Sequence, residues 1–229
     1  MLPLRDNVPT QRFPVVTVSL IGANFAVWFW ELHVGEATTD RYAYYPCSVV
    51  APCIGAAAAH HLPAWEGAFS SMFMHASWFH ILGNMLFLWI FGNNVEDALG
   101  RVRFLVWYLC AGLFATAVQT FVTLHFASSA DASVPNLGAS GAIAGVLGAY
   151  ALLLPTASVL TLVGFFVLPV PAFIFLGIWF GLQLWQGGFA VTHPAEGGGV
   201  AFFAHVGGFA FGAATVYLVA RRPPLRPYR

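Results

Sequence analysis

The chain has 229 residues, with nine arginines, no lysine and nine acidic residues, so its formal net charge is zero. Hydrophobic residues make up 59% of it and charged residues only 8%, with a mean hydropathy of +0.75. This composition excludes an ordinary soluble domain and predicts an integral membrane protein. The zero net charge argues against nucleic acid as a partner.

Six apolar segments each approach the length of about 20 residues that a helical span needs. In chain order they are Val15–Leu32, Phe79–Asn94, Val102–His125, Leu137–Leu154, Pro171–Gln186 and Val200–Ala220. Because lipid accommodates only helices and closed barrels, the predicted fold is an all-α bundle of six transmembrane helices. Residues 1–13 are predicted to be a polar N-terminal tail, residues 14–220 the membrane domain, and residues 221–229 an arginine- and proline-rich C-terminal tail.

The stretch between the fourth and fifth segments is the hardest to interpret. It is an apolar run interrupted by Pro169 and Pro171, and it is too short for two spans, which would need about 40 residues and a turn. We therefore expect Ala157–Leu168 to form a loop in or near the membrane interface, followed by a single span.

The arginines predict the orientation. Eight of the nine fall in the two tails or in the loop after the second segment, namely Arg5, Arg12, Arg101, Arg103, Arg221, Arg222, Arg226 and Arg229. In a six-span arrangement these places share one side of the membrane, and the positive-inside rule makes that side the cytoplasm. Both termini are thus predicted to be cytoplasmic. Without organelle-targeting features, the expected location is a bacterial plasma membrane, with the chain as a multi-pass protein.

Polar side chains at membrane depth are costly and are read first as functional candidates. Four stand out: His80 and Asn84 in the second segment, Ser140 in the fourth, and His205 in the sixth. With a helical rise of about 1.5 Å per residue, each lies about 18–24 Å from the arginine-rich end of its segment. The four side chains therefore share one layer, below the opposite membrane surface.

Helix faces allow these side chains to meet. The fourth and sixth segments each contain two glycines spaced four apart, which are Gly141, Gly145, Gly208 and Gly212. Such pairs let helices approach closely, as a hydrogen bond between Ser140 and His205 requires. Ser140 would lie in the first helical turn, where free N–H groups stabilise negative charge, and His80 and Asn84 would share one helix face. A nucleophile, a base and an oxyanion-stabilising pair together favour acyl transfer.

Three separated strings carry a family resemblance: "HASWFHILGNMLFLWIFGNNVEDALG", "GASGAIAGVLGAY" and "AHVGGFAFG". They closely resemble the motifs of the rhomboid intramembrane serine proteases, and the likeness extends from Pro14 to Ala220. The resemblance implies a serine endopeptidase that cuts transmembrane segments of membrane proteins near the outer face of the bilayer, with no cofactor or metal.

The resemblance also implies roles for individual residues. It implies a Ser-His dyad without a third carboxylate, with Ser140 as nucleophile and His205 as general base. The oxyanion hole would consist of His80, Asn84 and the backbone N–H of Ser140. Supporting positions around the water-accessible cavity would be His75, Gly138 and Gly141.

The chain departs from the family at two points. Many members carry a Trp-Arg pair ahead of the first histidine, whereas Glu66 and Gly67 occupy the aligned positions here, which leaves open how the first loop is held. The residue four after the serine, a tyrosine that packs on the catalytic histidine in some members, is Ala144. Trp179 or Phe180 is a candidate to fill that space.

The cysteines give no catalytic signal. Cys47 and Cys53 lie in the string "YPCSVVAPC" of the first loop, where a disulfide, free thiols and a zinc site with His60 and His61 are the alternatives. Cys110, inside the third segment, is predicted to be a small packing residue.

Gln119 and Gln183 are predicted to form interhelical hydrogen bonds.

Two alternative functions remain open. A catalytically inactive relative that binds membrane proteins is one alternative, and the presence of both Ser140 and His205 disfavours it. A small transporter is the other, although the sequence shows neither an inverted repeat nor an embedded carboxylate after the first segment.

Overall fold

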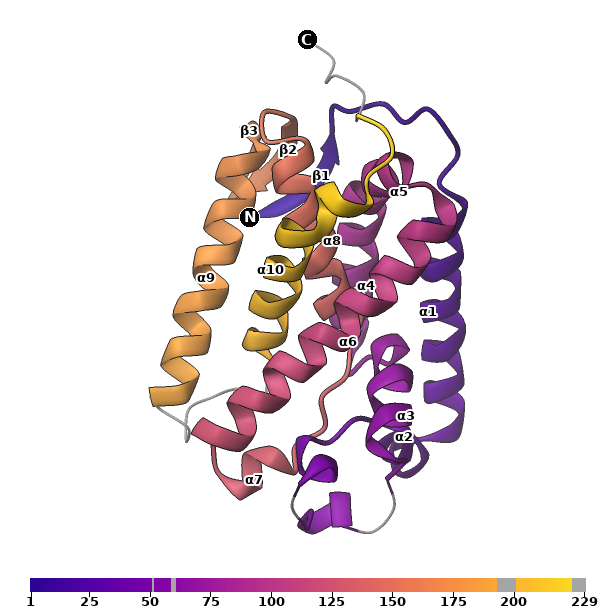
Figure 1. Ribbon diagram of the computed structural model, residues 1–229, viewed down its shortest axis with the longest axis vertical. Coiled ribbons are helices and arrows are strands. Elements are labelled where there is room, and N and C mark those ends of the chain that lie inside the picture. Colours follow the sequence, from indigo (N-terminus) through magenta and orange to yellow (C-terminus); the bar gives the residue numbers. More distant parts are fainter. Residues whose placement is uncertain (51, 59–60, 193–200, 224–229) are drawn as a thin grey trace.

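The computed structural model describes residues 1–50, 52–58, 61–192 and 201–223 (Figure 1). Long helices run along the length of the molecule, and short helices gather at one end. The long helical segments are α1 (Val15–Val34), α4 (Trp78–Phe87) continued by the π-helical turn η4 (Leu88–Gly92) and by α5 (Asn93–Leu99), α6 (Arg101–Phe126), α8 (Ser140–Leu153), α9 (Ala172–Thr192) and α10 (Phe202–Val219). The short ones are α2 (Glu36–Tyr42), α3 (Ala64–Ser70), α7 (Ser129–Ala132) and the 3₁₀ turns η1 (Pro46–Val49), η2 (Gly55–Ala58) and η3 (Ser71–Phe73).

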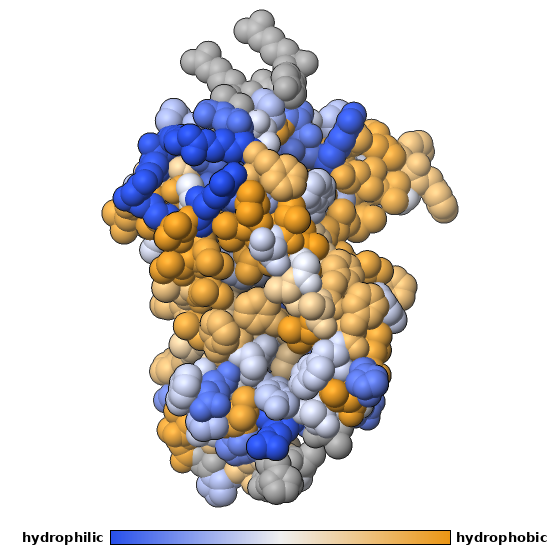
Figure 2. All heavy atoms as spheres, turned by 90° about the vertical axis from the view of Figure 1, so that its right-hand side faces the viewer, coloured by the Kyte–Doolittle hydropathy of each residue, from blue (hydrophilic) through white to orange (hydrophobic). Residues whose placement is uncertain are grey.

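Among the residues that the structure describes, four helices, α1, α6, α9 and α10, are long and apolar enough to cross a membrane. On the face shown in Figure 2, a band of hydrophobic residues lies between two more hydrophilic ends. Large apolar side chains such as Phe29 and Trp185 are more than half exposed, which suits contact with lipid. The chain is therefore a mostly helical, polytopic membrane protein. The predicted start of the sixth segment, Val200, lies outside the described residues.

Helix α8 lies at the centre of the bundle, and all of its residues from Gly141 to Tyr150 are buried. A helix that is apolar on every side is stable only when it is surrounded. Its small residues let α10 pack directly against its backbone. A methyl group added at Gly208 would overlap the carbonyl oxygen of Gly141, and one added at Gly212 would overlap that of Gly145. The predicted close packing of these two helices is confirmed.

Helix α8 is shorter than the helices that surround it. Its 14 residues span about 21 Å at about 1.5 Å per residue, which is less than the hydrocarbon core of about 30 Å. The chain enters α8 from a loop, which is anchored where the Gly138 N–H donates to the Ser71 carbonyl oxygen at 2.8 Å.

A three-stranded antiparallel sheet corrects the all-α prediction. Its strands, in the order β1-β2-β3, are β1 (Leu2–Asp6), β2 (Ser158–Val163) and β3 (Phe166–Pro171). The prediction that Ala157–Leu168 is a loop is thus wrong, because these residues form β2, the turn after it and the start of β3. The predicted N-terminal tail contains β1. The turn uses Gly164, whose φ of +60° suits glycine. Pro169 and Pro171 fit because β3 is an edge strand, where a missing N–H is tolerated.

The start of α1, the α5–α6 junction and the end of α10 meet at one end of the bundle (Figure 1). The Arg221 N–H donates to the carbonyl oxygen of Ala98 at 2.9 Å, and the Arg103 guanidinium donates to that of Val219 at 3.0 Å. We call this the arginine-rich end. Its described arginines are Arg5, Arg12, Arg101, Arg103, Arg221 and Arg222, whereas Arg226 and Arg229 lie outside the described residues.

Strand β1 is fastened to this end by Asp6. Its carboxylate accepts hydrogen bonds from the Tyr150 hydroxyl at 2.6 Å and from the Asn94 amide at 2.9 Å. Burial raises the pKa of Asp6 above its ordinary value, although these hydrogen bonds oppose the rise. Beside it, the Glu96 carboxylate accepts the N–H of Thr17 at 2.7 Å and so caps the first turn of α1.

The first loop is held without a Trp-Arg pair. The Ser70 hydroxyl donates to the Tyr42 carbonyl oxygen at 2.6 Å. Gly67 packs so closely on the preceding segment that an added Cβ would lie 3.2 Å from the Ala43 carbonyl oxygen. Backbone contacts between α2 and α3 thus take the place of the side-chain pair.

The structure shows the pairing of Cys47 and Cys53 and the position of Cys110. Cys47 and Cys53 form a disulfide with a Cα–Cα distance of 5.2 Å, so the alternatives of free thiols and a zinc site are wrong. His60, part of that zinc alternative, lies outside the described residues. Cys110 is exposed on α6 rather than packed inside the bundle.

Candidate active site

Ser140 and His205 are in direct contact. Ser140 is the first residue of α8, and His205 lies in the first turn of α10. The Ser140 Oγ and the His205 Nε2 are 2.7 Å apart, and both residues are partly buried. The close packing of α8 and α10 thus brings together two side chains that are 65 residues apart in sequence.

The other imidazole nitrogen faces α9. The His205 Nδ1 lies 2.7 Å from the Gln183 Oε1. An amide oxygen only accepts hydrogen bonds, so Nδ1 carries the proton and the Nε2 of a neutral ring is left to accept one from the Ser140 hydroxyl. Gln119 accepts the N–H of Ala204 on α10 at 3.1 Å. The interhelical hydrogen bonds predicted for the two glutamines are confirmed.

An aromatic ring covers His205 where Ala144 stands in place of the family's tyrosine. The Trp179 ring centroid is 5.9 Å from that of His205, with the planes inclined by 41°. Phe180 stacks on Phe209 instead, at 4.4 Å. Of the two aromatic candidates, Trp179 is the one that contacts the histidine.

His80 lies beside Ser140, across Gly138. A Cβ added at Gly138 would lie 2.8 Å from the His80 Nε2 and 3.6 Å from the Ser140 Oγ. Gly138 also has a φ of +129°, which side chains other than hydrogen disfavour. Glycine at this position therefore lets the imidazole of α4 approach the start of α8.

Asn84 is held by a chain of buried hydrogen bonds. Its Nδ2 lies 3.0 Å from the His75 Nε2, and the His75 backbone N–H donates to the two carboxylate oxygens of Glu31 on α1 at 3.2 and 3.3 Å. His75 is only 2% exposed and lies behind Asn84. Its predicted role in shaping a water-accessible cavity stays a prediction. The Asn84 amide has a second hydrogen that can serve another acceptor.

Backbone donors surround the serine. The N–H of Ile143 makes an early bond of the helix, to the Ala139 carbonyl oxygen at 3.0 Å. The N–H groups of Ser140, Gly141 and Ala142 precede it, in the turn where helical N–H groups have no acceptor within the helix. They add the positive end of the helix dipole to the site.

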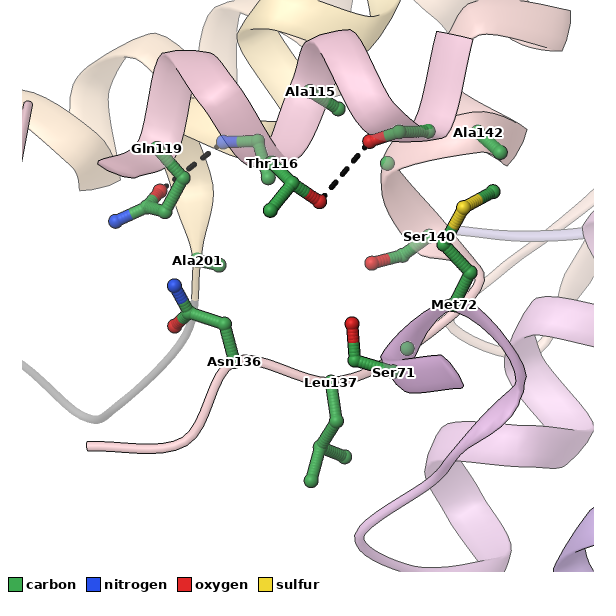
Figure 3. A pocket seen from close by; sticks show the side chains of 14 residues that line it. Ser71, Met72, Ala115, Thr116, Gln119, Asn136, Leu137, Ser140, Ala142 and Ala201 are labelled. Carbon is green, nitrogen blue, oxygen red and sulfur yellow. Dashed lines mark hydrogen bonds between the residues drawn. The ribbon is translucent and has the colours of Figure 1, made fainter. Parts of the chain in front are cut away.

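A small cavity of about 30 Å³ adjoins Ser140. Figure 3 shows the hydroxyl groups of Ser71 and Ser140 directed into it, with the side-chain amides of Gln119 and Asn136 at its other end. Thr116 also lines the cavity, and its hydroxyl donates to the Gly112 carbonyl oxygen at 3.1 Å. A water molecule needs a cavity volume of about 10–15 Å³ and two to four polar partners. The cavity therefore has the size and the polar groups to hold water next to the serine.

Several residues of this neighbourhood were not predicted from the sequence. Glu31 carried a usable signal, because it is an acidic residue within an apolar run. Ser71 and Asn136 carried none, since they lie in segments of ordinary loop composition whose path is set by tertiary contacts. In the part of the chain that the structure describes, no three His, Cys, Asp or Glu side chains gather so as to hold a metal ion.

The sequence is similar to a known protein family and to several curated proteins. Residues 63–222, more than half of the chain, match the family model described as the Rhomboid domain. Similar curated proteins include Presenilin-associated rhomboid-like protein A, mitochondrial, of Danio rerio, 38% identical over 103 residues (45% of this chain, 25% of the relative). Rhomboid protein 1, mitochondrial, of Saccharomyces cerevisiae is 30% identical over 153 residues (66% and 41%). Rhomboid-like protein 11, chloroplastic, of Arabidopsis thaliana is 37% identical over 87 residues (38% and 29%).

The names of these relatives correct one prediction. They are named as mitochondrial or chloroplastic proteins, and against this finding the prediction of a bacterial plasma membrane is wrong. The chain aligns with less than half of the length of each of these relatives.

Proposed function

This chain belongs to the rhomboid family, and from that premise we propose that it is an intramembrane serine endopeptidase. It cleaves transmembrane segments of membrane proteins near the membrane face opposite the arginine-rich end. The observation that carries the proposal is the 2.7 Å contact between the Ser140 Oγ and the His205 Nε2, made by a histidine whose other nitrogen is already bound.

The proposed reaction begins with a proton transfer. His205 Nε2 takes the hydroxyl proton of Ser140 as Oγ attacks the carbonyl carbon of the scissile peptide, and the carbonyl oxygen becomes negatively charged. The intermediate collapses when the C–N bond breaks and His205 returns the proton to the departing amine. An ester then joins Ser140 to the N-terminal fragment of the substrate.

The negative oxygen needs donors, and three groups supply them. The backbone N–H of Ser140, the His80 imidazole and the second amide hydrogen of Asn84 act as the oxyanion hole. Two observations support these roles. His80 packs against Gly138, and Asn84 is hydrogen-bonded to His75. Donors fixed before the reaction stabilise the transition state without having to reorganise.

Hydrolysis of the ester completes the cycle. Water from the cavity beside Ser71, Thr116 and Ser140 gives a proton to His205 Nε2 as its oxygen attacks the ester carbonyl carbon. The bond between that carbon and the Ser140 Oγ then breaks, His205 returns the proton to Oγ, and the N-terminal fragment leaves as a carboxylic acid. No cofactor or metal takes part. The hydroxyl groups and amides that line the cavity would keep water available in a layer otherwise occupied by lipid.

We further propose that all six helical segments cross the membrane. The short α8 and the segment from α4 to α5 complete the four longer spans, with residues 14–220 as the membrane domain and both termini on the arginine-rich side. The positive-inside rule makes that side the matrix or stroma in an organellar membrane. The partners are then the lipid bilayer and transmembrane protein substrates.

A fluorophosphonate probe tests this function, because it reacts with activated serines. Purified protein in detergent and its Ser140→Ala variant are labelled side by side. Labelling of the wild type alone supports the proposal. Absence of labelling in both would favour an inactive binding protein or a transporter, and equal labelling of both would place the reactive serine elsewhere; either result overturns the proposal.

A further inference from the structure

We propose that Gln183 is a positioning residue for the base of this reaction: it selects the tautomer of His205 and fixes the orientation of the ring. This inference rests on the proposed function, since a tautomer matters only if His205 takes a proton. Gln183 lies on α9, whereas the two residues of the dyad lie on α8 and α10. The base and its two hydrogen-bond partners would then come from three helices.

The two hydrogen bonds of His205 are the main argument. Its Nδ1 and Nε2 each have one partner at 2.7 Å, the Gln183 Oε1 and the Ser140 Oγ. A base that faces Ser140 must present a lone pair on Nε2, and a neutral imidazole does so only when its proton is on Nδ1. Because the Gln183 oxygen cannot donate, this contact stabilises the tautomer that the reaction needs.

The chemical nature of Gln183 suits its depth. Soluble serine proteases use a carboxylate for this task, but a charge at membrane depth is expensive. A neutral amide provides an acceptor oxygen without that cost. Gln183 is 9% exposed, so solvent does not compete strongly for the bond.

A second residue of the same helix restricts the ring. Trp179, one turn before Gln183, lies beside the His205 ring, with centroids 5.9 Å apart and planes inclined by 41°. The amide holds the edge of the imidazole while the indole limits its tilt. Two contacts of different kinds from α9 thus define both the rotation and the inclination of the base.

The experiment uses two variants of Gln183 in the full chain. Gln183→Met keeps the length and volume of the side chain but removes the acceptor oxygen, and Gln183→Glu restores an oxygen with the same reach. The matched control is Gln186→Met, the same change at an exposed position of α9. Steady-state cleavage of a transmembrane substrate and the thermal unfolding midpoint are measured for each, together with wild type and Ser140→Ala.

The inference predicts that Gln183→Met lowers kcat by about 10²-fold or more, with KM and the unfolding midpoint nearly unchanged. Gln183→Glu should recover most of the lost kcat, and Gln186→Met should match the wild type. If Gln183→Met keeps the wild-type kcat, or if the methionine and glutamate variants lose activity equally, Gln183 only joins the helices and the inference is overturned. Equal activity of wild type and Ser140→Ala would instead overturn the proposed function.

Discussion

Replacing Gly208 by alanine tests the helix packing that brings the site together. The added Cβ would overlap the Gly141 carbonyl oxygen and would lie 3.0 Å from its carbonyl carbon and 3.2 Å from the Ala144 Cβ. Unstrained carbon–carbon contacts are about 3.5–4.0 Å. Because the nearest obstacle is the backbone carbonyl oxygen of α8, the strain is relieved only if α8 and α10 move apart by about 1 Å or more.

That movement acts directly on the proposed dyad. His205 is one turn before Gly208 on α10, and its 2.7 Å contact with Ser140 spans the same two helices. A misplacement of about 1 Å can reduce catalysis about 10²-fold, and overpacking costs about 1–3 kcal/mol of stability. Gly208→Ala should therefore lower kcat about 10²-fold and reduce the unfolding midpoint.

The assay is cleavage of a transmembrane substrate in proteoliposomes, combined with thermal unfolding of the same preparation. Gly177→Ala is the matched control, because a Cβ at this position of α9 meets nothing within 4 Å. It should keep the wild-type rate and midpoint. Wild-type behaviour of Gly208→Ala would refute the claim that contact between α8 and α10 holds the site in place.

Three further changes test separate parts of the molecule. Asn84→Ala removes one oxyanion donor and should lower kcat by about 10²–10³-fold; an unaltered rate would remove Asn84 from the mechanism. The pKa of Asp6 is higher in the folded state than its ordinary value. Stability should therefore fall as the pH rises from about 4, near the pKa of Asp6 in the unfolded chain, through its pKa in the folded protein. Asp6→Asn should remove this part of the pH dependence, and an identical slope of unfolding midpoint against pH in the variant would contradict it. Cys47→Ser opens the loop disulfide and should cost about 2 kcal/mol, seen as a lower midpoint in the absence of reductant; a midpoint equal to that of the wild type would show that the bond does not stabilise the fold.

The helices and the Ser140–His205 pair were predictable because their signals are local. Long apolar runs show where helices lie, and the glycines at 141, 145, 208 and 212 show which two can touch backbone to backbone. Depth along a helix follows from counting residues. These three facts were enough to predict the contact that the structure contains.

The sheet could not be predicted, because it depends on a distant pairing. Leu2 pairs with Leu162 across most of the chain, and nothing in residues 1–13 alone favours a strand. The apolar run at Ser158–Val163 lies in a stretch that two prolines interrupt and that is too short for two spans, which favours a loop near the membrane interface. Their place on an edge strand became clear only from the fold.

The partner of Gln183 could not be predicted for a different reason. Helix α9 is apolar around its whole circumference, so the sequence does not show which face turns inward. A glutamine in such a helix indicates that some hydrogen-bond partner exists without identifying it. Only the rotation of α9 in the bundle directs Gln183 to His205 and Trp179 to the same ring.

The central claim is that Ser140, activated by His205, breaks a peptide bond inside the membrane. The most direct measurement reconstitutes wild-type protein, Ser140→Ala and His205→Ala in liposomes with one transmembrane substrate and identifies the products by mass spectrometry. The account predicts a cut within the transmembrane segment by the wild type and none by either variant, with all three proteins sharing the same unfolding midpoint. Normal turnover by Ser140→Ala would contradict it.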